Sequence, residues 1–544
     1  MSSALASGRI TRRWPSPASG SRPLVALEAP LTPVHFQYTR IADWPPLAWL
    51  ARCLPFERAI EVFHGDRVEI TPDWFCEAIW AGPYDAGGFD RTDVVFGSGC
   101  RIRGARATFV SSASTVDRLQ TLETPDGIWV SNSLACLLAA ARATVDPLYP
   151  RYFEDFRTVR EGLLRYRPSL ASSRGPVRLT YYGNLEWDGG RLRQVSKPAP
   201  VRDFGSFVKY RAFLGQALRD LADNMRGHER RRGYDFLGTI STGYDSPTVA
   251  VLAREAGLST AITVDRSRGG APDSGEEIAA WLGLRAHVVE RDVWRRVALA
   301  EVPFIAADAK GEDVHFKGAE ERLVGAALLT GFHGDAAWSK TSRPLSAEIV
   351  RKDQSGLSLS EYRLWIGFIH CPVPFLGIRQ LADINAISRS PEMAHWDWPR
   401  GYSRPICRRI VEEAGLPRRS FGIGKRATSV LLFDEEFLSP GSLADYTGWL
   451  ADHTGDPRGP TSRSSDALRQ LSDRLLGMVA RFTPRRWSRA HRVVDGLRRI
   501  GKREPRFRYV FPWALARAGG RYGQGLPIAA DRSTRYDPIS TPTP

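Results

Sequence analysis

The sequence contains few cysteines and no long hydrophobic run, and each shortage excludes a class of protein. Only six cysteines occur in 544 residues, and no two of them form a Cys-x-x-Cys pair. This excludes a disulfide framework and argues against a thiolate zinc site, so we expect reduced, buried thiols in a cytoplasmic protein. The longest apolar stretches, such as 134–141, fall far short of the roughly 18 residues that span a bilayer. Integral membrane association is therefore not expected.

Acidic residues are absent from the first 27 positions, which are rich in Ser, Ala, Arg and Pro. This composition predicts a disordered arm over 1–35. The pair Arg12-Arg13 would suit a twin-arginine export signal, but the apolar stretch that such a signal needs is replaced by Trp14-Pro15-Ser16-Pro17. Beyond the arm, 42% hydrophobic and 25% charged residues are globular values, and the length suggests several structural units.

The positive charge of the chain, formally +16, is concentrated near its C-terminal end. Residues 456–544 contain 19 Lys and Arg against 7 Asp and Glu, which gives this segment +12 and leaves +4 for the other 455 residues. Within it, arginines interleave with apolar residues at spacings of three and four over 485–500, which predicts an amphipathic helix with a basic face. Its arginines either face solvent on a helix that packs against the protein, or they form a binding site for an anionic partner. Such a partner would be an acidic or leader peptide, a nucleic acid or a membrane surface.

Two patterns of secondary structure divide the rest of the chain. Residues 36–200 contain short β-type runs separated by Gly, Asp and Ser, and 184–191 fits a hairpin. From 204 to 455, predicted helices alternate with buried strands, which implies a parallel, doubly wound sheet. The strands are expected at 235–240, 260–264, 286–289 and 326–330, and the helices at 207–224, 246–256, 274–282 and 318–325. Ligands bind such sheets at the carboxyl ends of the strands.

The most informative segment is Ile240-Ser-Thr-Gly-Tyr-Asp-Ser246, which follows one predicted strand and begins a helix. Small residues at 241–243 let the backbone curve so that successive N–H groups point into one hollow at the positive end of the helix dipole. Such a hollow suits a pyrophosphate group, and a carboxylate at Asp245 beside phosphates is suited to binding Mg²⁺. The alternative is a plain turn with serine as the helix N-cap.

The segment 241–246 resembles the Ser-Gly-Gly-x-Asp-Ser signature of the PP-loop ATP pyrophosphatases. Three further segments resemble the asparagine synthetase-like branch of that family: Asp273 with the following helix, Leu329-Thr-Gly-Phe-His-Gly-Asp335, and 374–376 followed by Leu416-Pro417 and Lys425. The resemblance covers about 204–435. It implies an α/β fold with a PP-loop (adenine nucleotide alpha hydrolase-like) sheet, preceded by a β-rich domain over 36–200 that is similar to a degenerate Ntn glutaminase domain.

The resemblance implies an enzyme that activates a carboxylate with ATP and Mg²⁺ as an acyl-adenylate, after which an amine attacks to give an amide and AMP. Asp245 and Asp335 would hold the Mg²⁺, and Lys425 would stabilise the charge that develops during the reaction, unless it is an ordinary surface lysine. The residues expected to bind ATP are Ser241, Gly243, Tyr244, Asp245, Ser246, Thr263, Val264 and Gly331.

Several positions depart from the pattern of that family. Phe332 replaces an acid or tyrosine, Ala336 replaces an acid, and His370-Cys371-Pro372 stands where the family has Glu-x-Arg. Because a phenyl ring cannot transfer protons, His333 is the local candidate for a general base, and a structural or solvent-facing histidine is the alternative of at least equal weight. These changes lower the expectation that the substrate is aspartate.

The family's glutaminase uses an N-terminal cysteine nucleophile, whereas this chain begins Met-Ser-Ser and its first cysteine is Cys53. An N-terminal nucleophile needs its own α-amine as base, so we expect no glutamine hydrolysis. Beta-lactam synthetases and lasso-peptide macrolactam synthetases share this arrangement, which favours a natural-product or peptide substrate bearing a carboxylate and an amine. The alternatives are an ammonia-dependent asparagine synthetase, a non-catalytic nucleotide- or peptide-binding homologue, and a PP-loop RNA-modifying enzyme that uses the basic tail.

Overall fold

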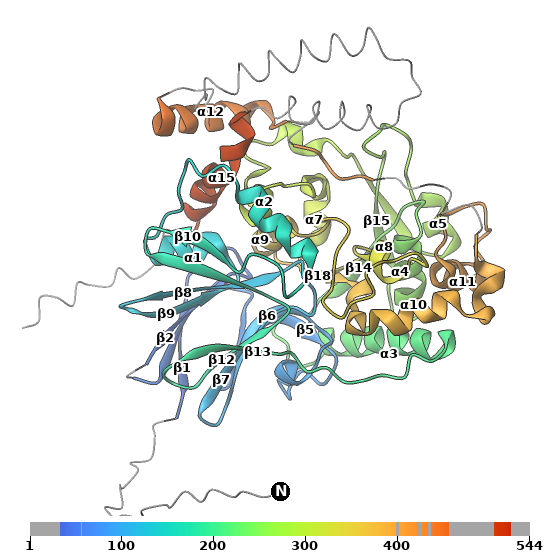
Figure 1. Cartoon of the computed structure of the whole chain (residues 1–544), viewed down its shortest axis with the longest axis horizontal. Coiled ribbons are helices and arrows are strands. Elements are labelled where there is room, and N and C mark those ends of the chain that lie inside the picture. Colours follow the sequence, from blue (N-terminus) through green and yellow to red (C-terminus); the bar gives the residue numbers. More distant parts are fainter. Residues whose placement is uncertain are drawn as a thin grey trace, which may run out of the picture.

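A computed structural model describes residues 33–55, 57–398, 402–422, 424, 427–432, 437–455 and 505–523. A β-rich part formed by the N-terminal third lies beside a part in which helices surround a separate sheet (Figure 1). Within the described ranges, no helix has the length and apolar character needed to cross a membrane. The predicted helix over 485–500 and residues 1–32 of the predicted arm lie outside these ranges, whereas the first strand already begins at His35.

The β-rich part consists of two sheets whose neighbouring strands are antiparallel, except for the parallel pair β1 and β3. The seven-stranded sheet has the order β1 (His35–Arg40), β3 (Ala59–His64), β2 (Trp49–Leu54), β9 (Gly127–Ser131), β8 (Arg118–Thr124), β11 (Gly175–Tyr181), β10 (Ser169–Ser172). The six-stranded sheet has the order β13 (Leu192–Val195), β12 (Asn184–Trp187), β7 (Arg106–Val110), β6 (Val95–Arg103), β5 (Trp74–Trp80), β4 (Glu69–Ile70). The predicted hairpin is confirmed, because β12 pairs with β13 around a turn at 188–191.

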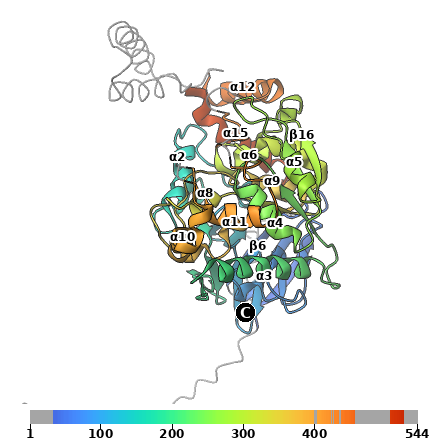
Figure 2. The same ribbon diagram turned by 90° about the vertical axis from the view of Figure 1, so that its right-hand side faces the viewer.

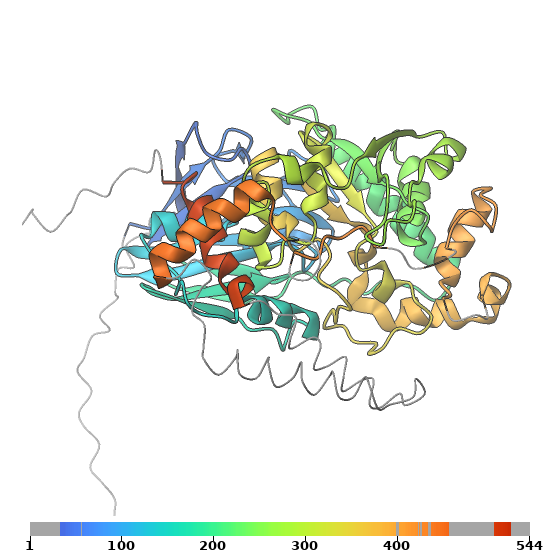
Figure 3. The ribbon, with the colours of Figure 1, turned by 90° about the horizontal axis from the view of Figure 1, so that it is seen from above.

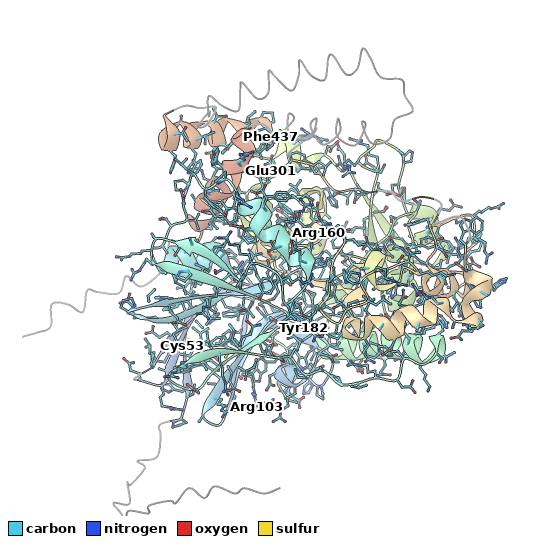
Figure 4. All side chains as sticks on the ribbon, viewed as in Figure 1. Cys53, Arg103, Arg160, Tyr182, Glu301 and Phe437 are labelled. Carbon is cyan, nitrogen blue, oxygen red and sulfur yellow. The ribbon has the colours of Figure 1, made fainter. Side chains whose placement is uncertain are left out.

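A buried aromatic cluster joins these two sheets. Trp49 of the first sheet stacks on Phe109 of the second at 6.1 Å and meets Phe75 edge-on. All three rings are fully buried, and such contacts add to the free energy gained by burying apolar surface. Cys53 lies in this cluster, within the β-rich part (Figure 4). All six cysteines are free and buried, as the sequence predicted.

The third sheet is parallel throughout, which confirms the predicted parallel sheet. Its order is β16 (Arg285–Val289), β15 (Thr260–Val264), β14 (Asp235–Thr239), β17 (Ala326–Thr330), β18 (Ile369–Pro372). β14, the first of these five strands along the chain, lies in the middle, and the strand order reverses between β14 and β17. In open α/β sheets, ligands bind at the carboxyl ends of the strands at such a reversal. A ligand site is therefore expected at the loops after β14 and β17.

Alternating side chains on the parallel strands point into two separate cores, because successive strand residues face opposite sides of a sheet. Phe236 and Leu237 illustrate this, since they belong to different buried clusters. Helices α3 (Phe207–Met225), α4 (Asp245–Arg254), α5 (Glu276–Trp281), α10 (Leu381–Arg389) and α11 (Pro405–Glu413) cover one face (Figure 2). Helices α6 (Val302–Asp308), α7 (Glu320–Leu323), α9 (Leu359–Ile366), α12 (Pro440–Thr454) and α15 (Val510–Gly519) contribute to the core on the other face.

The predicted helix over 318–325 is only partly correct. The chain forms a 3-10 turn at Val314–Ala319 and then the four-residue helix α7. A side chain at Gly318 would lie 2.5 Å from Val289, so the turn packs closer to the sheet than a regular helix with larger residues could. The other short helices are α1 (Leu134–Ala140), α2 (Tyr152–Arg157) and α8 (Gly334–Ala337), and 3-10 turns occur at 89–91, 158–161, 293–296, 373–375, 378–380, 391–396 and 505–509.

Buried charges connect the β-rich part to the part that contains the parallel sheet. Arg363 of α9 donates to both carboxylate oxygens of Glu77 on β5 and to Asp117 before β8. All three residues are less than 5% exposed. Helix α15 packs on α6 and on α1, and α12 and α15 lie over the β-rich part when the molecule is viewed from above (Figure 3). Residues from both parts therefore share the same cores.

Candidate functional site

A cavity of about 240 Å³ lies at the carboxyl ends of β14, β15 and β17. Its walls include every predicted site residue that the structure describes: Ser241, Gly243, Tyr244, Asp245, Ser246, Thr263, Val264, Gly331, His333 and Asp335. Lys425 lies outside the described residues, although Ala427, Thr428 and Ser429 line the same cavity. Residues from four segments that are distant in the sequence thus meet at the strand-order reversal.

The turn between β14 and α4 forms one wall of the cavity. The Ser241 and Ser246 hydroxyls are 2.8 Å apart, and the backbone N–H of Gly243 donates to Ser241 Oγ at 3.3 Å. These contacts hold the turn closed around the start of α4. The N-cap residue Tyr244 gives no side-chain hydrogen bond to the helix, so backbone N–H groups of the first turn stay available to an anion.

The side chain of Tyr244 anchors this turn and is itself buried. Its ring lies 4.9 Å from the ring of Tyr402 and meets Phe421 edge-on. Its hydroxyl donates to the carbonyl of Tyr402 at 3.3 Å and accepts from Arg408 at 2.5 Å. The segment 402–422 therefore fixes the turn from outside, and Tyr244 would contribute to ligand binding through its backbone.

Asp245, the first residue of α4, and Asp335 of α8 both line the cavity, after neighbouring strands of the parallel sheet. The loop after β17 passes so close that a side chain at Gly331 would lie 2.6 Å from Asp245 Cβ, and one at Gly334 would lie 2.5 Å from Asp245 Cγ. Glycine is required where two backbones and a carboxylate approach this closely. The structure thus brings the Asp245 carboxyl group against the residue that precedes Asp335.

Arg404 is a site residue that the sequence reasoning missed. It lines the cavity, is 4% exposed, and forms an ion pair with Asp245 Oδ1. Burial lowers the pKa of the Arg404 guanidinium, but the Asp245 carboxylate more than offsets this and raises it above its ordinary value. A permanent cation therefore stands beside the turn. No spacing rule could have found it, because Arg404 lies 159 positions from Asp245.

The oxygen groups at this end of the cavity suit a magnesium ion that is shared with a phosphate ligand. Among the residues that the structure describes, no group of three or more His, Cys, Asp or Glu could hold a metal unaided. Mg²⁺ commonly takes only one or two carboxylates and obtains its other ligands from water and substrate phosphates. The pair Asp245 and Asp335 fits that requirement.

The end of β15 forms a second wall. Thr263 Oγ1 accepts from the backbone N–H of Gly275 at 2.8 Å, and Thr242 Oγ1 donates to Asp273 Oδ1 at 2.7 Å. Both bonds tie the segment before α5 to the cavity wall. The expected contact of Thr263 and Val264 with adenine stays a prediction.

His333 lines the cavity in a constrained position. It has a left-handed backbone with φ of 74°, and its ring stacks on Phe375 at 4.6 Å. Burial, together with the charge of Arg351, lowers the pKa of His333 to about 3. The imidazole is therefore neutral at pH 7. Its role as a general base stays a prediction, and a neutral ring with this pKa is a weak proton acceptor.

Two more carboxylates that the sequence reasoning did not single out line the cavity, Asp313 and Asp353. Burial raises the pKa of Asp353, but the nearby Arg351 guanidinium at 3.9 Å lowers it below its ordinary value. Burial and the neighbouring Glu312 raise the pKa of Asp313 to about 8. These two acids therefore differ in their ability to hold a proton near pH 7.

No family model matches this chain, and a search of curated proteins likewise gives no match.

Proposed function

We propose that this chain is a cytoplasmic, ATP- and Mg²⁺-dependent amide ligase of the asparagine synthetase-like type. It would convert a carboxylate to an acyl-adenylate with release of pyrophosphate, and an amine would then displace AMP. One observation carries this proposal. The loops that follow β14 and β17 deliver Asp245 and Asp335 to one cavity, at the strand-order reversal and beside the start of α4.

The residues of the cavity have separate roles in this proposal. Backbone N–H groups at the start of α4 bind phosphate oxygens, and the serine hydroxyls at 241 and 246 add donors. Asp245 and Asp335 hold Mg²⁺, which supplies charge neutralisation at the phosphates when bound. The guanidinium of Arg404 adds a fixed cation, and Lys425 serves the same end if it lies at the cavity.

The amine in this proposal does not come from glutamine hydrolysis by this chain. Burial raises the pKa of the Cys53 thiol, which removes the thiolate that a nucleophile requires. The amine is therefore part of the substrate or a second molecule, as in the natural-product ligases that the sequence resembles. A peptide or other secondary metabolite with both a carboxylate and an amine is the proposed substrate class.

A second candidate function is that of a homologue that binds nucleotide without catalysing a reaction. The ion pair with Arg404 favours this candidate, because it occupies the Asp245 carboxylate. Phe332 and Ala336 favour it as well, because they stand where the resembled family has an acid or tyrosine and an acid, respectively. Tight ATP binding without product formation would identify this candidate. Among the residues that the structure describes, which exclude most of the basic tail, no specific contact favours asparagine synthesis from free ammonia or RNA modification.

The proposal is tested by measuring pyrophosphate release from ATP and Mg²⁺ with a panel of amino acids and short peptides. We expect release that depends on one class of acid and falls at least 100-fold in Asp335→Asn. The control is Asp235→Asn, an exposed aspartate at the opposite end of β14, which should keep full activity. Formation of ADP and phosphate alone, or equal loss in both variants, would contradict the proposal.

A further inference from the structure

Asp313 is a buried carboxylate that faces the cavity from the start of the turn Val314–Ala319. The residue is 1% exposed and yet lines the cavity wall. Its Oδ2 accepts from the backbone N–H of Gly356 at 2.8 Å and from the Ser358 hydroxyl at 2.7 Å. Within the described part of the chain, its side chain makes no other hydrogen bond, so both bonds fix one oxygen and leave Oδ1 for a ligand.

This carboxylate lies near Phe332 and His370, where the resembled family carries an acid or tyrosine and a glutamate, respectively. A side chain at Gly356, whose N–H binds Asp313, would lie 2.9 Å from both Phe332 Cδ2 and His370 Cε1. The ring of Phe332 cannot carry a proton, and burial lowers the pKa of His370 to about 3. A base for proton transfer at this place would therefore come from another element, and Asp313 binds Gly356, the residue that packs against both rings.

The charges around Asp313 come from several elements. Glu312 precedes it and pairs with Lys310, and Asp308 at the end of α6 adds a second negative charge. Across the cavity wall, Arg351 pairs with Asp353, and His315 follows in the same turn. Burial is the largest cause of the raised pKa of Asp313, and Glu312 is the next. A carboxylate with a pKa of about 8 is matched to proton transfer near neutral pH.

We propose that Asp313 receives the attacking amine of the acceptor substrate and takes its proton, an inference that rests on the proposed ligase function. The nitrogen forms a bond to the acyl carbon, and the bond from that carbon to the adenylate oxygen breaks. AMP leaves with the electron pair, and one N–H proton of the neutral amine passes to Asp313. Phe316 and Phe332 line the same cavity, so the acceptor is a primary amine carried on an apolar chain.

The test separates activation of the acid from attack by the amine. Hydroxylamine is largely uncharged at neutral pH and traps acyl-adenylates without a strong base, so hydroxamate formation across the acid panel identifies the acid. With that acid, Asp313→Asn should keep pyrophosphate release and hydroxamate formation. Amide formation with alkyl primary amines should fall about 100-fold or more, which is the usual contribution of a general base.

The matched control is Glu312→Gln, which removes a neighbouring buried acid that does not line the cavity. Because the charge of Glu312 raises the pKa of Asp313, the variant should keep amide formation and move the rise of its pH profile to lower pH. A purely structural role for Asp313 would not shift this profile. If Asp313→Asn fails to fold, the Glu312→Gln profile decides the question alone.

The outcomes separate the two proposals. No pyrophosphate release by the wild-type protein with any acid overturns the proposed function itself. Release with unchanged amide formation in Asp313→Asn, or a pH profile that Glu312→Gln leaves in place, overturns the role of Asp313 and keeps the ligase. Equal loss of pyrophosphate release and amide formation in a folded Asp313→Asn also overturns it.

Discussion

Two glycines allow the carboxyl group of Asp245 to lie against the loop after β17. Gly334 is the tighter contact, because its added Cβ would lie 2.5 Å from both Cγ and Oδ1 of Asp245. These two atoms cannot move away easily, since the Asp245 carboxylate pairs with Arg404 and Asp245 is the first residue of α4. This glycine therefore lets the loop that carries Asp335 lie against the Asp245 carboxyl group.

We predict that Gly334→Ala lowers the free energy of unfolding by about 1–3 kcal/mol, the usual cost of overpacking. Urea unfolding measures this change. The control is Gly448→Ala on α12, where no atom lies within 4 Å of the added Cβ and where the helix should gain up to about 1 kcal/mol. A Gly334→Ala protein as stable as the control would mean that the loop after β17 is not confined by Asp245.

Two buried histidines make the protein sensitive to acid. Burial lowers the pKa of His333 and of His370 to about 3, whereas the unfolded chain titrates near 6.5. The unfolded state therefore binds more protons between these values, and stability is lost as the pH falls from 6.5 towards 3.

We predict a loss of about 1.4 kcal/mol per pH unit for each histidine in that range. His370→Gln removes one of these groups, so the free energy of unfolding should fall less steeply with acidification than in the wild type. Urea unfolding at pH 7, 6, 5 and 4 gives the slope. Equal slopes for the two proteins would show that His370 is not held neutral by the fold.

The sequence predicted the site residues on the two strand loops, because each loop carries small residues and an aspartate in a local pattern. Eight residues of these two loops line one cavity, together with Thr263 and Val264 at the end of β15. Arg404, Asp313 and Asp353 were not predicted, since each comes from a distant segment and has no local signature. Their positions depend on tertiary packing, which a single sequence does not display.

At the scale of elements, the segment 402–422 holds the turn between β14 and α4 in place. The backbone N–H of Gly422 donates to the carbonyl of Thr242 at 2.9 Å, and Gly422 has a φ of 63°. A side chain at Gly422 would lie 2.4 Å from the ring of Tyr244. The contact between the segment 402–422 and the turn thus depends on a glycine at position 422.

We predict that Gly422→Ala loosens the turn and costs at least about 1 kcal/mol, because alanine is strained at this φ and meets the tyrosine ring. Amide hydrogen exchange of peptides covering 240–246 should become faster. Gly424→Ala, two residues away and with no atom within 4 Å of the added Cβ, is the control and should leave exchange unchanged. Unchanged exchange in Gly422→Ala would show that the segment 402–422 does not hold the turn in place.

The regular elements were the easiest to predict. The strands at 260–264 and 326–330 occur with the predicted bounds, because each is a short apolar run between turn residues. Strand β18 was missed. It has only four residues and ends in proline, so it shows neither the length nor the alternation on which strand prediction depends.

At the scale of the whole molecule, the buried group Arg363, Glu77 and Asp117 fastens the β-rich part to the part with the parallel sheet. Removal of one partner from a buried ion network leaves uncompensated charge. We predict that Arg363→Met lowers the free energy of unfolding by about 3–5 kcal/mol. The change should appear in one cooperative transition, because both large cores draw residues from both parts.

Urea unfolding monitored by tryptophan fluorescence and by far-UV circular dichroism tests this prediction. The control is Arg517→Met, whose pair with Asp445 is partly exposed and should contribute less than about 1 kcal/mol. Two separate transitions in the wild type, or equal effects of the two variants, would contradict a joined core. The sequence could not predict this joint, since it depends on residues 246 and 286 positions apart.

The central claim is that the cavity between the loops after β14 and β17 binds ATP with Mg²⁺. Isothermal titration calorimetry of the full chain with ATP, in the presence of Mg²⁺ and then of a chelator, tests it most directly. The account predicts saturable binding of one ATP per chain that weakens at least tenfold without Mg²⁺ and in Asp335→Asn. Absence of saturable binding, or binding that neither the chelator nor the substitution changes, would contradict it.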